Sequence, residues 1–153
     1  DTKTGKPLLS WRVAMLPYIE EQELYNQFKL DEPWDSPHNI RLLEKMPPYF
    51  ACPSSVTKPG HTSYLAVSSE DCGLHPTKAL PFAAFTDDRS NCLILVEVSA
   101  DQSVPWTAPV DLSPNKLELL RDAKTSHHGG RHVAFLDMAI RFIPTGWSAE
   151  QWR

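Results

Sequence analysis

Fourteen prolines are scattered along the 153 residues of this chain. Each proline lacks a backbone donor and interrupts a helix interior or a central strand, and their share exceeds the usual value of about 5%. Because they are spread out rather than clustered, they do not mark a disordered proline-rich tract. The pattern predicts short helices and strands joined by long loops that proline stiffens.

The length favours a single globular domain over residues 1–153, large enough to bury a core. Helical patterns come first and strand patterns follow, which is typical of the α+β class. The net charge is -4 and no long basic run occurs, which argues against a nucleic-acid partner. No stretch approaches the about 20 apolar residues of a membrane span, and no secretory signal is visible at the first residue.

Residues 10–28 carry the strongest helical pattern, with Ser10 as a plausible N-cap and apolar residues at helical spacing. Pro17 disturbs it, so we expect either a kink there or two helices, the second opened by Pro17. Two interpretations of Trp11 and Arg12 stay open. They form a binding surface, or the indole lies in the core while the guanidinium is solvated.

Two further segments are typical of strands, residues 62–67 and residues 92–98. The second is almost continuously apolar, which predicts cover on both faces. Glu97 at its end is expected to be a paired or partly exposed carboxylate rather than a general base. Trp106 stands among prolines and is expected to anchor its loop to the core. The alternative is a ligand- or glycan-binding surface formed by exposed Trp34 and Trp106.

The Ser-Pro pairs at residues 36–37 and 113–114 each predict a helix start, because serine caps and proline suits the first turn. The last residues, 147–153, are typical of another helix that is beginning. Three cysteines occur, Cys52, Cys72 and Cys92, with no CxxC pair, which argues against a thiolate zinc site. At most one internal disulfide is possible, and its pairing stays open.

Residues 127–143 combine a histidine pair, a glycine pair and two runs of β-forming residues. They predict a β-hairpin with a tight turn at Asp137-Met138. Gly129 and Gly130 are expected to shape its entry and Asp137 to set its turn. His127 is expected to hydrogen-bond to the backbone or to a carboxylate.

The alternative interpretation of the same segment is a divalent metal site formed by His127, His128 and His132, with Asp137 as ligand or base. Alternation along a strand separates His132 from Asp137. His128 and His132 meet only if the glycine pair folds the chain back. No P-loop, dinucleotide fingerprint or Gly-x-Ser-x-Gly elbow points to another chemistry.

Residues 8–20 resemble the "SWRV-x-x-LPY-(I/L)-E" signature of a large planctomycete family with a prepilin-type N-terminus and no assigned function. The segment from His127 to Asp137 is similar to its C-terminal signature, a histidine, nine residues and Asp-Gly, although Met138 replaces the glycine. Other matching segments are Leu24–Phe28, Asp31–Asp35, Cys52-Pro53-Ser54, Thr62-Ser63-Tyr64, Ser90-Asn91 before Leu93–Glu97, and Val104–Thr107 with Pro109 and Asp111-Leu112. The family positions taken as structural or binding residues are Trp11, Arg12, Pro17, Tyr18, Trp34, Ser90, Asn91, Glu97, Trp106, His127, Gly129, Gly130 and Asp137.

The resemblance implies a pilin- or pseudopilin-like domain, with N-terminal helices packed on a small, mainly antiparallel sheet. In such proteins a methylated helix lies in the inner membrane and a globular domain follows on the envelope side. The chain would then be that domain without its membrane helix, on the periplasmic side of the inner membrane or outside the cell. An oxidising compartment would permit a disulfide.

The function implied by the resemblance is non-enzymatic: a pseudopilin-like subunit or an assembly module that needs no cofactor. Its partners would be proteins of an envelope assembly, self-association among them, and it would contact the membrane only through the missing helix. The alternative is a metal-binding protein or metal-dependent enzyme that uses the three histidines. Asp31, Glu32 and Asp35 either bind a hard cation such as calcium or form a solvated acidic loop. Calcium is disfavoured, because the spacing is neither EF-hand-like nor dense in oxygen ligands.

Overall fold

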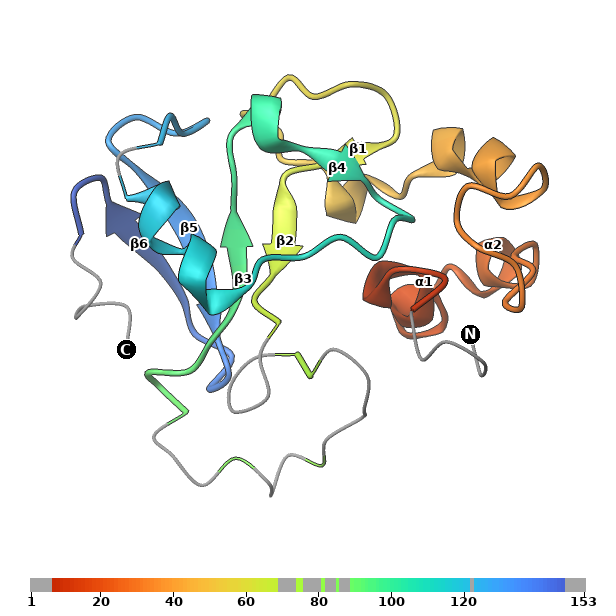
Figure 1. The fold of residues 1–153 in the computed structure, drawn as a ribbon, viewed down its shortest axis with the longest axis horizontal. Helices are drawn as coiled ribbons and strands as arrows, with labels where there is room; N and C mark the ends of the chain where they lie inside the picture. Colours follow the sequence, from red (N-terminus) through yellow and green to blue (C-terminus); the bar gives the residue numbers. More distant parts are fainter. Residues whose placement is uncertain are drawn as a thin grey trace.

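The computed structural model describes residues 7–68, 74–75, 81, 85, 89–121 and 123–147. The N-terminal helices lie at one end and a four-stranded antiparallel sheet at the other, with further short helical turns beside the sheet, so the α+β class is confirmed (Figure 1). Within the described part of the chain, every helix is too short or too polar to cross a membrane. The short elements agree with the interruptions expected from the prolines.

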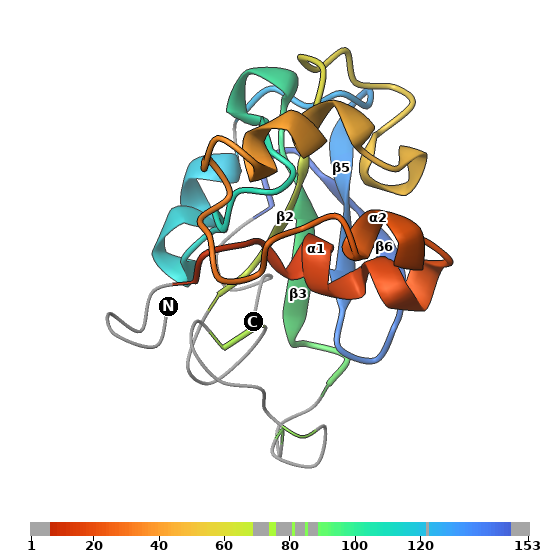
Figure 2. The same ribbon diagram turned by 90° about the vertical axis from the view of Figure 1, so that its right-hand side faces the viewer.

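The N-terminal helical segment is divided at Pro17. Helix α1 (Trp11–Met15) is followed by the 3-10 helix η1 (Leu16–Ile19), which has Pro17 in its first turn, and then by α2 (Gln22–Tyr25). The Ser10 hydroxyl accepts a hydrogen bond from the backbone N–H of Arg12, as an N-cap does. The prediction of two helices is therefore confirmed, and the single kinked helix is wrong. Figure 2 turns α1 and α2 towards the viewer, with the strands behind them.

The helices predicted after the two Ser-Pro pairs are 3-10 helices rather than α-helices. Pro37 and Pro47 flank the first of these segments and leave little length for α-helical propagation, and short segments settle into the tighter 3-10 form. The 3-10 helices after η1 are η2 (Asn39–Lys45), η3 (Pro48–Phe50), η5 (Ala100–Gln102), η6 (Pro114–Lys116) and η7 (Glu118–Leu120). Most of the segment predicted as a C-terminal helix lies outside the described residues.

The main sheet has the strand order β2-β3-β5-β6 and every neighbouring pair is antiparallel. Its strands are β2 (Tyr64–Ala66), β3 (Leu93–Glu97), β5 (Gly130–Phe135) and β6 (Ile140–Pro144). A separate pair joins β1 (His61–Thr62) to β4 (Val104–Pro105). The single strand predicted over residues 62–67 is thus split at Ser63 between two sheets.

The predicted hairpin is present as β5 and β6, but its turn lies one residue earlier than predicted. The Phe135 carbonyl accepts from the Met138 N–H at 3.0 Å, which makes Leu136 and Asp137 the central residues. Met138 follows with a φ of +67°. A turn followed by one left-handed residue is a common three-residue hairpin loop. The predicted tight turn at Asp137-Met138 is therefore present as part of a three-residue loop, and Met138 carries its left-handed backbone.

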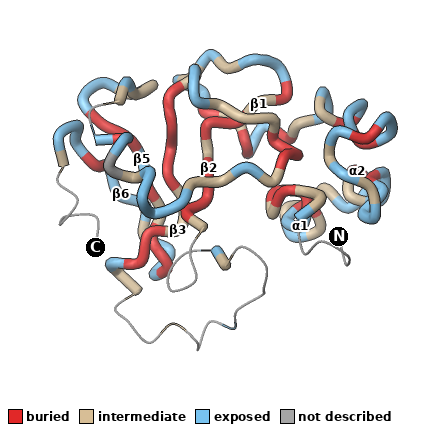
Figure 3. Tube along the Cα trace, in the orientation of Figure 1, coloured by how far each residue is buried: buried red, intermediate tan, exposed pale blue. Residues whose placement is uncertain are grey.

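Two hydrophobic clusters stabilise the two ends. One lies in the sheet and its covering segments, and the other surrounds Trp106 between the N-terminal helices and η3. Trp106 is fully buried, stacks on Phe50 at 5.8 Å between ring centroids and donates from Nε1 to the Leu43 carbonyl. Its anchoring role is confirmed, and its use in an exposed binding surface is wrong. Figure 3 shows buried chain along β2 and β3.

Candidate functional site

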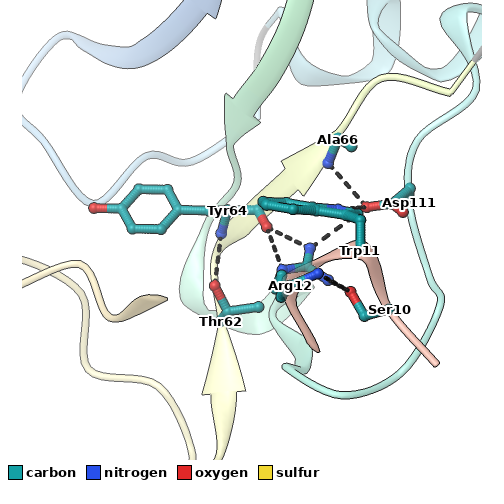
Figure 4. A network of polar contacts seen from close by, with 7 residues as sticks. All are labelled: Ser10, Trp11, Arg12, Thr62, Tyr64, Ala66 and Asp111. Atoms are coloured by element: carbon teal, nitrogen blue, oxygen red, sulfur yellow. Dashed lines mark hydrogen bonds and ion pairs between the residues drawn. The ribbon is translucent and has the colours of Figure 1, made fainter. Parts of the chain in front are cut away.

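The guanidinium of Arg12 is fully buried against the outer edge of β2 (Figure 4). Its Nε and Nη2 donate to the carbonyl of Tyr64, and its Nη1 donates to the Ser10 hydroxyl at 2.7 Å. Asp111 lies beside it, with Oδ1 3.4 Å from Arg12 Nη2. The same oxygen accepts from the Trp11 indole at 3.1 Å and from the backbone N–H of Ala66 at 2.9 Å.

These contacts cover the edge strand, whose free backbone groups would otherwise be open to pairing with another chain. The expectation of a solvated guanidinium is wrong, because Tyr64 and Asp111 offer acceptors inside the fold. Burial lowers the pKa of Arg12 to about 10, although the nearby Asp111 opposes the shift. Burial also raises the pKa of Asp111. Arg12 is therefore committed to the interior, whereas the half-buried Trp11 packs against the hydrophobic cluster around Trp106.

A second group of polar side chains gathers on the other side of Tyr64. Three side chains each place one atom that could bind a metal within 4.8 Å of the other two. They are Cys52 just after η3, Glu97 at the end of β3 and His127 just before β5. The His127 Nε2 lies 3.6 Å from the Cys52 Sγ and 3.0 Å from Glu97 Oε2. Cys52 and Glu97 are buried, and the His127 side chain is 22% exposed. We call these three residues the Cys-Glu-His cluster.

The sheet register explains how the cluster forms. Tyr64 pairs with Glu97 across β2 and β3, so the two side chains share one face of the sheet. On the other side, the pairing of β3 with β5 brings His132 next to Glu97, with 3.5 Å between His132 Nδ1 and Glu97 Oε2. A residue on each neighbouring strand thus flanks the buried carboxylate.

The glycine pair does fold the chain back, which was the condition for His128 to meet His132, but the histidine that it brings to His132 is a different one. Residues His127 and Gly130 form an antiparallel bridge, and Gly129 between them has a φ of +79°. The rings of His127 and His132 consequently lie edge to face, 4.6 Å apart. His128 is exposed and lies outside the cluster. Of the three histidines predicted as metal ligands, the structure therefore brings together His127 and His132.

Asp137 lies in the hairpin turn, away from the histidines. Its Oδ1 accepts from the backbone N–H of Ala139 at 2.9 Å, and its Oδ2 lies 3.3 Å from Arg141 Nη2. These contacts agree with a role in setting the turn. As alternation along the strand predicts, Asp137 is separate from His132.

The Cys-Glu-His cluster does not have the geometry of a nucleophilic triad. Such a triad uses one imidazole nitrogen as base and the other for the orienting carboxylate. Here a single atom, His127 Nε2, contacts both the thiol and the carboxylate. Burial, followed by the contact with Glu97, raises the pKa of Cys52 and keeps the thiol neutral. A sulfur, a nitrogen and an oxygen that converge on one point are instead typical of transition-metal ligands.

The remaining predicted residues lie apart from the cluster. Pro17 is half-buried and Tyr18 is 85% exposed. Trp34 is half-buried, and its backbone N–H donates to the carbonyl of Leu8. Ser90 is half-buried beside the exposed Asn91, and its carbonyl accepts from Arg141.

Sequence reasoning missed one residue of the cluster, Cys52, and two residues beside it, Tyr64 and Arg131. Cys52 and Tyr64 lie in segments that carry the family resemblance, and that is the only signal that pointed to them. The third, Arg131, is buried and donates to the backbone carbonyls of Glu97 and Leu120. Burial lowers the pKa of Arg131. Its position in an alternating strand gave no sign that it points inward.

The model of one protein family, SBP_bac_10, described as a protein of unknown function (DUF1559), matches residues 1–120. The chain belongs to this family. The DUF1559 match includes Cys52, Tyr64 and Glu97, whereas His127 and His132 lie beyond it. No curated protein and no solved structure matches the chain.

Proposed function

We propose that this DUF1559 chain is the envelope-side domain of a pseudopilin-like protein and serves as a non-enzymatic subunit or assembly module. The main observation in support is the use of the N-terminal signature. Arg12 and Trp11 donate to acceptors within the fold, where they fasten the N-terminal helices to the edge of β2. A signature used in this way builds a scaffold rather than a catalytic centre.

The cysteines support the compartment that the resemblance implies. Cys92 is disulfide-bonded, whereas Cys52 carries a free, buried thiol. Disulfides persist mainly in oxidising compartments. The proposed location is therefore the periplasmic side of the inner membrane or the cell exterior, reached through a membrane helix that precedes this domain.

Tyr18 is the signature side chain that we expect to face a protein partner. It is 85% exposed and lies in η1, next to the helix that Arg12 fastens to the sheet. Exposed tyrosines are well suited to interfaces because they combine an apolar ring with a polar tip. The partner would be a component of an envelope assembly or a second copy of this chain.

The location is tested by fractionating cells that produce the full-length protein. We expect it in the inner-membrane fraction, and we expect protease added to spheroplasts to digest this domain. A soluble cytoplasmic protein is the control and should survive until the cells are lysed. Recovery of the protein in the cytoplasmic fraction, protected from protease, would overturn the proposal.

The partner face is tested with a photo-crosslinking amino acid at position 18 of the full-length protein. We expect light-dependent adducts in intact cells. Position 56 is the control, because Val56 is 95% exposed and lies outside the signature. Equal adducts from both positions, or none from position 18, would contradict the assigned face.

A second function, metal binding, is favoured by one specific observation. The Cys-Glu-His cluster gathers three ligand types at one point, and His132 lies beside it. The candidate ligands therefore differ from the histidines predicted from the sequence: Cys52 and Glu97 join His127, and His128 is left out.

A further inference from the structure

The Cys-Glu-His cluster presents donor atoms from three segments that are far apart in the sequence. Cys52 is 5% exposed and Glu97 is 3% exposed, so both reactive groups lie inside the fold. A buried carboxylate needs compensating positive charge. Arg131 does not compensate the carboxylate directly, because it donates to the backbone carbonyl of Glu97. The side chains that contact the carboxylate are His127 and His132.

One atom of His127 faces the other ligand-type atoms of the cluster. Its Nε2 lies 3.1 and 3.0 Å from the two oxygens of Glu97 and 3.6 Å from the Cys52 sulfur. Without a metal, His127 donates to the carboxylate and the neutral Cys52 thiol donates to the same carboxylate. A cation among the three atoms would take the place of these protons and bind nitrogen, oxygen and sulfur together.

The distances fit a tetrahedral metal ion. Zinc binds sulfur at about 2.3 Å and nitrogen or oxygen at about 2.0–2.1 Å, so a tetrahedral site separates sulfur from nitrogen by about 3.6 Å and nitrogen from oxygen by about 3.4 Å. The observed separations are 3.6 Å between Cys52 Sγ and His127 Nε2, and 3.0 Å between His127 Nε2 and Glu97 Oε2. The first agrees and the second requires a shift of a few tenths of an ångström.

We propose that Cys52, Glu97 and His127 bind a divalent transition-metal ion of the zinc class. His132 lies at the edge of this site, outside the three ligands, with its Nδ1 3.5 Å from Glu97 Oε2. Its side chain is 46% exposed, so the ion enters from that side.

The chemistry of the donors selects the metal class. A mixed set of thiolate, imidazole and carboxylate in tetrahedral arrangement favours zinc over calcium or magnesium, which prefer oxygen ligands. On binding, the Cys52 thiol releases its proton to solvent and the sulfur bonds to the metal. The two charges of the ion are then balanced by one thiolate and one carboxylate, which leaves a formally neutral site in the interior.

The test is a titration of the purified, chelator-treated chain, its Cys92 disulfide left intact, with Co²⁺, followed by competition with Zn²⁺. We expect one Co²⁺ per chain, a thiolate-to-cobalt charge-transfer band, and loss of that band when Zn²⁺ is added. X-ray absorption of the zinc-loaded protein should show one sulfur in the first coordination shell. Absence of saturable binding, or a bound metal without a sulfur ligand, would overturn the proposal.

Variants distinguish this site from a loose histidine cluster. His127→Gln and Cys52→Ser should each weaken zinc binding by about a hundredfold or more, since each removes a direct ligand. His128→Gln is the matched control, because His128 is adjacent in sequence, exposed and outside the cluster. It should leave the affinity unchanged, and a loss equal to that of His127→Gln would contradict the assignment. If a ligand variant fails to fold, the sulfur signal of the unmodified protein still decides the question.

The proposed metal site and the proposed envelope location can be overturned independently of each other. A metal-free protein at the inner membrane would overturn only the metal site, and a cytoplasmic zinc protein would overturn only the location.

Discussion

At the scale of single residues, Tyr64 connects the two polar networks. Its backbone carbonyl accepts from the Arg12 guanidinium, and its phenol lies within hydrogen-bonding reach of the Cys52 thiol. Burial, with the nearby Cys52 and Glu97, raises the pKa of Tyr64. The phenol therefore stays protonated and can act as a hydrogen-bond donor beside the cluster.

Met138 is a residue whose backbone conformation conflicts with its side chain. It holds a φ of +67°, and its side chain is 76% exposed and adds little packing. A non-glycine residue in the left-handed region is less stable by about 1–2 kcal/mol. Glycine at this position would remove that strain.

We expect Met138→Gly to stabilise the fold by about 0.5–1 kcal/mol, because the greater freedom of glycine in the unfolded chain offsets part of the relief. Denaturant unfolding measures the change, and Tm should rise by about 1–4 °C. Met138→Ala keeps a non-glycine residue at this positive φ. It is therefore the control, and it should not raise the free energy of unfolding. Stabilisation by alanine as large as that by glycine would rule out the backbone explanation.

At the scale of elements, the entry to the β5–β6 hairpin depends on two glycines for two different reasons. Gly129 has a φ of +79° and open space around the position where a Cβ would lie. A Cβ at Gly130 would lie 2.3 Å from the carbonyl oxygen of Ile143 and 2.6 Å from the Phe142 ring. The first position thus requires a left-handed backbone, and the second requires the absence of a side chain.

Alanine at the two positions should therefore have unequal effects. Gly130→Ala is expected to destabilise the protein by about 2–3 kcal/mol, since it forces the two strands apart. Gly129→Ala should reduce stability by only about 1 kcal/mol, the strain of the left-handed backbone. Urea unfolding of both variants measures the difference. Equal losses would show that crowding at Gly130 does not limit the hairpin.

At the scale of the whole molecule, the Arg12–Asp111 pair joins the helical end to the sheet end. The two residues are 99 positions apart and meet at the edge of β2. Each end has its own hydrophobic cluster, so this polar contact helps to fix one end relative to the other. Because the guanidinium is buried, its loss would leave Asp111 and the Tyr64 carbonyl without their partner.

We expect Arg12→Met to lower the free energy of unfolding by about 3–5 kcal/mol, as the removal of one member of a buried pair typically does. Lys29→Met is the matched control, because Lys29 pairs with Glu32 at 2.9 Å on the surface. Water already screens that pair, so its loss should change stability little. Comparable losses in the two variants would contradict the structural role of Arg12.

Local patterns predicted the features that depend on neighbouring residues. Helix α1 with its Ser10 cap, the break at Pro17, strand β3 and the final hairpin all follow from capping, proline geometry and alternation, which act over a few residues. The turn was placed one residue too late because Asp137-Met138 was interpreted as the central pair, by analogy with Asp-Gly. Of these two residues only Met138 has a positive φ, and it ends a three-residue loop.

Contacts between distant segments decided the remainder, because burial and register are set only when the chain folds. The sequence shows Cys52, Glu97 and His127 in three separate segments, and only strand pairing and the turn at Gly129 bring them within 4.8 Å. Likewise, Arg12 resembles a surface residue until Asp111 and the edge of β2 surround it. The sequence by itself determined the α+β class and the approximate position of most elements, and the tertiary structure determined the bounds of these elements and which side chains meet.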